Sequence, residues 1–61
     1  MNTEWIYDML KEYVIKEGIR TTSDRLDTTY EYMLSEGYGE SLGVAAGALS
    51  ADSKIREMLE K

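Results

Sequence analysis

Residues 12–19 read Glu-Tyr-Val-Ile-Lys-Glu-Gly-Ile, and residues 31–38 read Glu-Tyr-Met-Leu-Ser-Glu-Gly-Tyr. Each copy of this repeated phrase carries a glycine after a stretch compatible with helix, and an apolar residue follows that glycine. A left-handed glycine followed by an apolar residue is typical of the Schellman ending of an α-helix. The two copies therefore predict that one helix ends at Gly18 and a second at Gly37.

The residues before the first glycine predict a helix over about 3–17. Asn2 or Thr3 can cap its N-terminus, and Glu4 favours the positive end of the helix dipole. Six apolar residues fall on one broad face at helical spacing. They are Trp5, Ile6, Met9, Leu10, Tyr13 and Val14.

A second helix is predicted over about 23–36, with Thr21 or Ser23 as its N-cap. Its apolar stripe consists of Leu26, Tyr30, Met33 and Leu34. On this assignment the tyrosine of the second phrase, Tyr32, lies about 140° from the centre of the stripe, whereas Tyr13 lies at the centre of its own. The two phrases therefore share a helix ending and not a buried face.

A third helix is predicted over about 40–60. Leu42, Ala45, Ala46 and Leu49 share one face of its first half, but the apolar residues of the second half sit about 120° further round. This change of phase predicts a break or kink near residues 50–52.

These elements predict an all-α fold, a small antiparallel bundle of three helices over about 3–17, 23–36 and 40–60. The connections between them are short, which favours antiparallel neighbours. No alternating apolar and polar pattern indicates a strand. The 61 residues are long enough for one domain, which we assign to residues 1–61.

The composition argues against catalysis and against metal or cofactor binding. The chain has no cysteine and no histidine, so it lacks thiolate ligands, the commonest metal ligand and the commonest general base. A core of this size supplies no more than roughly 3–5 kcal/mol of stability. We therefore expect a protein that is not an enzyme, binds no cofactor, and gains stability from tight packing or from self-association.

The charge and the apolar pattern suggest a soluble, cytoplasmic protein. Twelve acidic residues against seven basic ones give a net charge of −5, the opposite sign to that of most nucleic-acid-binding domains. The N-terminus has no basic segment followed by an apolar run, so we expect no signal peptide. The longest apolar-rich stretch, residues 42–49, is too short to span a bilayer.

The glycines around residues 37–43 allow one alternative function. A dinucleotide site would need a preceding strand, which the pattern lacks. Gly37-Tyr38-Gly39 resembles the Gly-hydrophobic-Gly hairpin of helix-hairpin-helix DNA-binding modules, with Gly43 where that family places a small residue. The resemblance covers about a dozen residues. It implies that backbone amides of the hairpin bind the DNA backbone, but Glu36 and Glu40 depart from the family pattern.

The main functional hypothesis is protein–protein interaction. Tyrosine is enriched in protein interfaces, and the chain has five tyrosines and no phenylalanine. Helical spacing predicts that Ile15 and Tyr32 point away from the core, where they would anchor a partner. The predicted contact residues are Ile15, Asp27, Glu31, Tyr32, Glu36, Tyr38 and Glu40, whose acids would complement a basic partner. Such a protein would be a small acidic inhibitor, adaptor or regulator of a larger protein, such as a nucleic-acid-binding one.

A row of small residues suggests a second kind of contact, between two copies of the chain. Gly43, Gly47 and Ala51 recur every four residues, so they share one side of a helix. Each glycine costs roughly 1 kcal/mol of helix propensity, which favours a packing reason for the row. We therefore predict that this row could form a homodimer interface.

Overall fold

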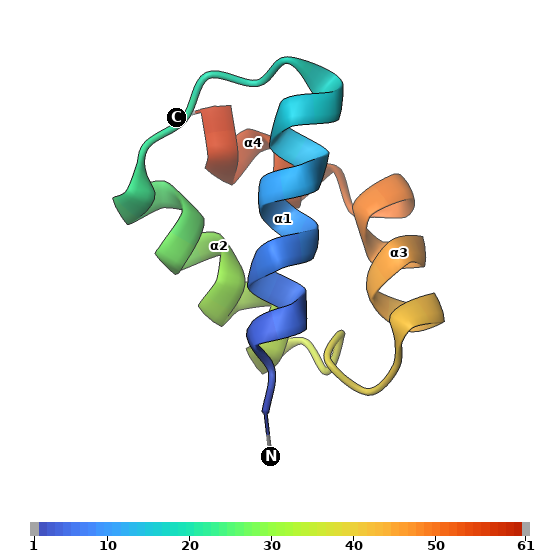
Figure 1. The fold of residues 1–61 in the computed structure, drawn as a ribbon. Helices are drawn as coiled ribbons and strands as arrows, with labels where there is room; N and C mark the ends of the chain where they lie inside the picture. Colours follow the sequence, from blue (N-terminus) through green and yellow to red (C-terminus); the bar gives the residue numbers. More distant parts are fainter. Residues whose placement is uncertain (1, 61) are drawn as a thin grey trace.

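The computed structural model describes residues 2–60, and all regular structure in this range is α-helical. Four helices follow in order: α1 (Glu4–Glu17), α2 (Ser23–Ser35), α3 (Leu42–Ala51) and α4 (Ser53–Glu60). In Figure 1, α1 and α2 run in opposite directions and α3 stands to one side of them. The predicted all-α class is confirmed. The predicted count of three helices is wrong, because the segment expected over 40–60 forms two separate helices.

The repeated phrase ends α1 and α2 in the same way. Gly18 and Gly37 have left-handed φ angles of 66° and 80°. The backbone N–H of Ile19 donates to the carbonyl of Val14 at 3.0 Å, and Tyr38 makes the equivalent bond at the end of α2 at 2.9 Å. These bonds are those of a Schellman motif, so the helix endings predicted from the phrase are confirmed.

Side-chain caps decide where the first three helices begin. Asn2, Thr22 and Ser41 each accept a hydrogen bond from a backbone N–H in the first turn of α1, α2 and α3, at 2.9, 3.3 and 3.2 Å. The prediction that Thr21 or Ser23 caps α2 is therefore wrong by one residue. The Ser41 cap also moves the start of α3 two residues beyond the predicted position of 40.

The core is built by α1, α2 and α4. Its largest fully buried apolar side chains are Ile6, Leu10, Met33, Ile55 and Leu59. The most extensive helix contacts are those of α2 with α4 and with α1, while α3 packs mainly against α4. Helix α3 buries only two alanines and packs one larger side chain, the partly buried Leu49, against the core.

A buried threonine rotates α2 relative to the prediction. Thr29 is fully buried, and its hydroxyl donates to the carbonyl of Arg25 at 2.7 Å, which gives the buried O–H a partner. The buried face of α2 therefore centres on Thr29 and Met33. Leu34, which the apolar stripe placed inside, is 37% exposed. The same rotation turns Tyr32 towards the protein.

Asp52 forms the corner between α3 and α4. One carboxylate oxygen, Oδ1, accepts a hydrogen bond from the backbone N–H of Lys54 at 3.0 Å, at the start of α4. The other, Oδ2, accepts from the hydroxyls of Tyr32 and Tyr38 at 2.6 and 2.8 Å. The break predicted near residues 50–52 is thus confirmed, and Asp52 ties it to α2 and to the turn that follows α2.

We predict that Gly37→Ala destabilises the fold by about 1–2 kcal/mol, the cost of placing an L-residue in a left-handed conformation. A Cβ at Gly37 would meet no atom within 4 Å, so the loss would come from backbone strain and not from a clash. Gly37→Asn is the matched control, since asparagine tolerates this conformation better and should lose less. Urea denaturation followed by circular dichroism measures both. Equal losses in the two variants would contradict the backbone explanation.

We also predict that the hydrogen bonds at Asp52 make stability fall at both ends of the pH range. The Tyr32 and Tyr38 hydroxyls lower the pKa of Asp52, so their contribution is complete above the unfolded value of about 3.9 and is lost as pH falls through the lower folded pKa. The hydrogen bond to Asp52 raises the pKa of Tyr32 and of Tyr38. Their contribution is therefore complete below about pH 10 and is lost as pH rises through the raised folded values.

Thermal melting across this pH range tests the assignment. Tyr32→Phe should lessen the alkaline loss, because only Tyr38 then retains a hydroxyl on Asp52. The control is Tyr30→Phe, whose hydroxyl contacts Thr3 and no carboxylate, and which should keep the alkaline loss. An alkaline limb that is the same in Tyr32→Phe as in the wild type would show that this hydrogen bond does not contribute.

Candidate protein-binding site

Helix α3 has an apolar surface that the rest of the chain does not cover. Its sequence, LGVAAGALSA, contains no charged residue. A helix that is apolar on all sides is normally buried, yet only Ala45 and Ala48 are buried here. Leu42 is 66% exposed and Val44 is 41% exposed. The exposed non-polar residues, which we call the α3 face, are Leu42, Gly43, Val44, Ala46, Gly47 and Ala51.

Part of the α3 face was expected to be inside. The predicted stripe of this segment included Leu42 and Ala46, and both are exposed, while Ala48 is buried instead. An alanine- and glycine-rich helix has little contrast between its sides, so the helical period alone could not select the inner one.

The predicted row of small residues lies on the α3 face. A Cβ at Gly47 would meet no atom within 4 Å, and one at Gly43 would meet only the Ser41 hydroxyl, at 4.0 Å. Ala51 is also exposed. Neither glycine is therefore needed for packing within the chain, and the self-association predicted for the row remains a prediction.

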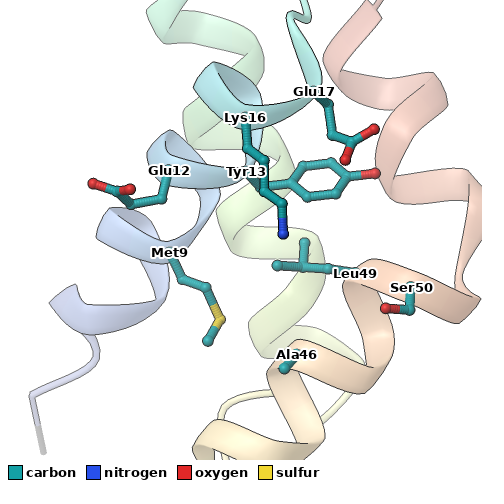
Figure 2. A pocket seen from close by; sticks show the side chains of 8 residues that line it. All are labelled: Met9, Glu12, Tyr13, Lys16, Glu17, Ala46, Leu49 and Ser50. Atoms are coloured by element: carbon teal, nitrogen blue, oxygen red, sulfur yellow. The ribbon is translucent and has the colours of Figure 1, made fainter.

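An open groove of about 600 Å³ runs between α1 and α3. Figure 2 shows Met9 and Lys16 reaching from α1 towards α3, with Leu49 reaching back and the Tyr13 ring at one end. Met9, Tyr13 and Leu49 give the groove an apolar interior. Its lining residues are Met9, Glu12, Tyr13, Lys16, Glu17, Ala46, Leu49 and Ser50.

A second hollow lies on the other side of α3. It has a volume of about 450 Å³ and is lined by Tyr38, Gly47, Ala48, Ala51 and Asp52. Helix α3 therefore stands as a ridge between two depressions, and a partner helix or loop could contact the ridge and either depression together.

The expectation that Tyr32 is free on the surface is wrong. Tyr32 packs against the core and donates its hydroxyl to Asp52. Its ring stands nearly perpendicular to that of Tyr38, with the ring centres 6.4 Å apart. Tyr38, also predicted to contact a partner, packs against the core and bonds to the same carboxylate. Both tyrosines thus have structural roles that the helical period of α2 could not reveal, because Asp52 is 20 residues away from Tyr32.

The structure exposes the other predicted contact residues. Ile15 is 76% exposed, on a different side of α1 from the buried Ile6 and Leu10. The predicted acidic residues are also exposed: Asp27, Glu31, Glu36 and Glu40. Asp27 and Glu31 lie on α2, and Asp27 lines a hollow with residues of α1. Glu36 and Glu40 lie between α2 and α3, so only these two precede the N-terminal end of the α3 face. Their role in binding a partner remains a prediction.

Gly39 has a packing role in the hairpin that resembles DNA-binding modules. A Cβ at Gly39 would lie 2.9 Å from Cδ1 of Ile6 and 3.2 Å from Cδ2 of Leu34. Glycine lets the chain pass close to the core there, because a larger residue would require the ends of the Ile6 and Leu34 side chains to move. The exposed Glu36 and Glu40 flank the same turn, where they would repel phosphate groups.

The aromatic residues near the start of α1 form a small acidic hollow of about 310 Å³, lined by Glu4, Tyr7, Asp8, Asp27 and Tyr30. The rings of Tyr7 and Tyr30 are nearly perpendicular, with centres 5.7 Å apart. Desolvation, followed by the charge of Asp27, raises the pKa of Tyr7. Lys11 Nζ lies 5.7 Å from the centre of the Tyr7 ring, so a cation of the chain itself occupies this ring.

Within residues 2–60, no three acidic, histidine or cysteine side chains are grouped closely enough to hold a metal ion. None of the helices in the described part of the chain has the length and apolar character needed to cross a membrane.

Comparison of the chain with protein-family models, with curated proteins and with solved structures finds no match.

Proposed function

We propose that this protein is non-catalytic and acts by binding another protein through the α3 face and the adjoining α1–α3 groove. It would work in the cytoplasm as a small inhibitor, adaptor or regulator. The observation that carries the proposal is an uncharged helix with Leu42 and Val44 exposed to solvent. Exposed apolar patches of this kind mark interaction sites in small proteins.

The energetics of α3 favour a surface that a partner covers. At ten residues, α3 is shorter than the roughly 12–15 residues at which an isolated helix becomes marginally stable in water. Each of its two glycines costs about 1 kcal/mol relative to alanine. Fully burying an exposed leucine or valine contributes about 1.5–3 kcal/mol. A partner that covers Leu42 and Val44 would therefore stabilise both the complex and α3.

The charge of the chain indicates which heterologous partners would suit it. Asp27, Glu31, Glu36 and Glu40 are exposed, and Glu36 and Glu40 lie between α2 and α3, ahead of the N-terminal end of the α3 face. A partner with an apolar seam and a basic border would match both features, since complementary charge accelerates association. Nucleic-acid-binding proteins have such basic surfaces, which keeps them among the candidate targets.

The alternative, nucleic-acid binding through residues 37–43, makes a different prediction about ionic strength. Binding to phosphates releases counterions, so affinity would fall steeply as salt is raised. Fluorescence anisotropy with labelled single- and double-stranded oligonucleotides measures this directly. We expect no binding in physiological salt. Low-micromolar, salt-sensitive binding would favour the alternative over the protein-partner proposal.

We predict that Leu42→Ser prevents capture of the partner, whereas Ile15→Ser does not. Both substitutions remove a well-exposed aliphatic side chain, from the α3 face and from the outer side of α1 respectively. Tagged wild type and the two variants, checked for equal helicity, would be compared in affinity capture followed by mass spectrometry. Capture that depends on Ile15 and not on Leu42 would place the contact on α1 and overturn the assignment to α3.

A further inference from the structure

We propose that the occupant of the α3 face is a second copy of this chain, in a symmetric dimer whose two α3 helices cross with opposed chain directions. This inference rests on the proposed function, because it assigns a partner to the same surface. A partner of this kind is always present at the concentration of the protein itself. Stability and partner binding would then be linked by mass action.

The distribution of charge favours a second copy on this surface. In a two-fold contact, residues near the axis meet their own counterparts, so any charged residue there would face a like charge. The chain carries a net charge of −5, and α1, α2 and α4 all contain charged residues. Helix α3 contains none. It is therefore the helix on which two copies of this acidic protein can meet without like-charge repulsion at the axis.

The shape of the surface is self-complementary when the helices run in opposite directions. Leu42, at the first position of α3, is the most exposed of its large side chains. The α1–α3 groove opens beside the other half of the helix, at Ala46, Leu49 and Ser50. Opposed helices bring Leu42 of each copy towards the groove of the other, so the same contact forms twice.

The small residues allow the two helices to approach. The separation of packed helices, about 8–10 Å between axes, depends on the side chains at the contact. Gly43 and Gly47 present almost no side-chain bulk on the α3 face, and little of the chain lies over them. This gives the glycines a packing role that the isolated chain does not provide.

The length of α3 limits the strength of the dimer. Ten residues of helix extend about 15 Å, which places the contact at the small end of protein interfaces. We therefore expect reversible association in the micromolar range and a thermal midpoint that rises with protein concentration.

Charge-pair variants at Ala46, near the middle of α3, test the symmetric contact. Sedimentation equilibrium of the wild type should show a monomer–dimer equilibrium. Ala46→Glu and Ala46→Lys each place a like charge against its own copy, so each variant alone should be monomeric. An equimolar mixture of the two should form dimers again, because opposite charges then meet. Both substitutions use good helix formers, and the restored dimer would itself show that both variants fold.

Ile15→Glu is the matched control, since it adds the same charge on the outer side of α1 and should leave the dimer intact. A wild type that stays monomeric up to millimolar concentration overturns the inference, as do Ala46 variants that each still dimerise. If the protein is monomeric and captures a different protein through Leu42, the inference of a dimer is overturned and the proposed function still stands. A monomer whose capture is unaffected by Leu42→Ser would overturn both.

Discussion

The position of α3 depends on the carboxylate of Asp52. Its two oxygens receive three hydrogen bonds, one from the start of α4 and two from the hydroxyls of Tyr32 and Tyr38. Hydrogen bonds to a charged acceptor are roughly twice as strong as neutral ones. Helix α3 fully buries only two alanines and packs Leu49 against the core, so its apolar contacts with the body are fewer than those of the other helices. The Asp52 corner therefore contributes much of what holds α3 in place beside the core.

Most of the buried apolar side chains and most of the exposed apolar side chains belong to different helices. The large buried side chains come from α1, α2 and α4, and α3 adds Ala45 and Ala48 to the same core. Helix α3 leaves Leu42 and Val44 in solvent, so the chain alone does not gain the free energy of burying them. A partner on the α3 face would bury them. In a symmetric dimer the acidic residues of α2 would also be presented twice.

The sequence predicted the helices well where the signal was local. Gly18 and Gly37 marked two helix ends correctly, because a left-handed glycine and the apolar residue after it act within one turn. The break before α4 was likewise visible as a change of apolar phase. The prediction failed at Thr29, since a buried polar residue that bonds to its own helix cannot be recognised from an apolar stripe. Because of that one error, the prediction placed Tyr32 on the outer side of α2, whereas in the structure Tyr32 packs against the core.

The candidate site was predictable only in part, for a related reason. The row containing Gly43 and Gly47 was visible as a spacing, but whether it faced the core or solvent depended on which side of an almost uniformly apolar helix turned inward. The hydrogen bonds that tie the C-terminal end of α3 to Tyr32 and Tyr38 are long-range, and no local pattern encodes them. Tyr32 is therefore connected to the proposed binding surface in a way different from the one first expected. In the proposed complex its role would be to hold, through Asp52, the corner from which α3 presents its apolar face.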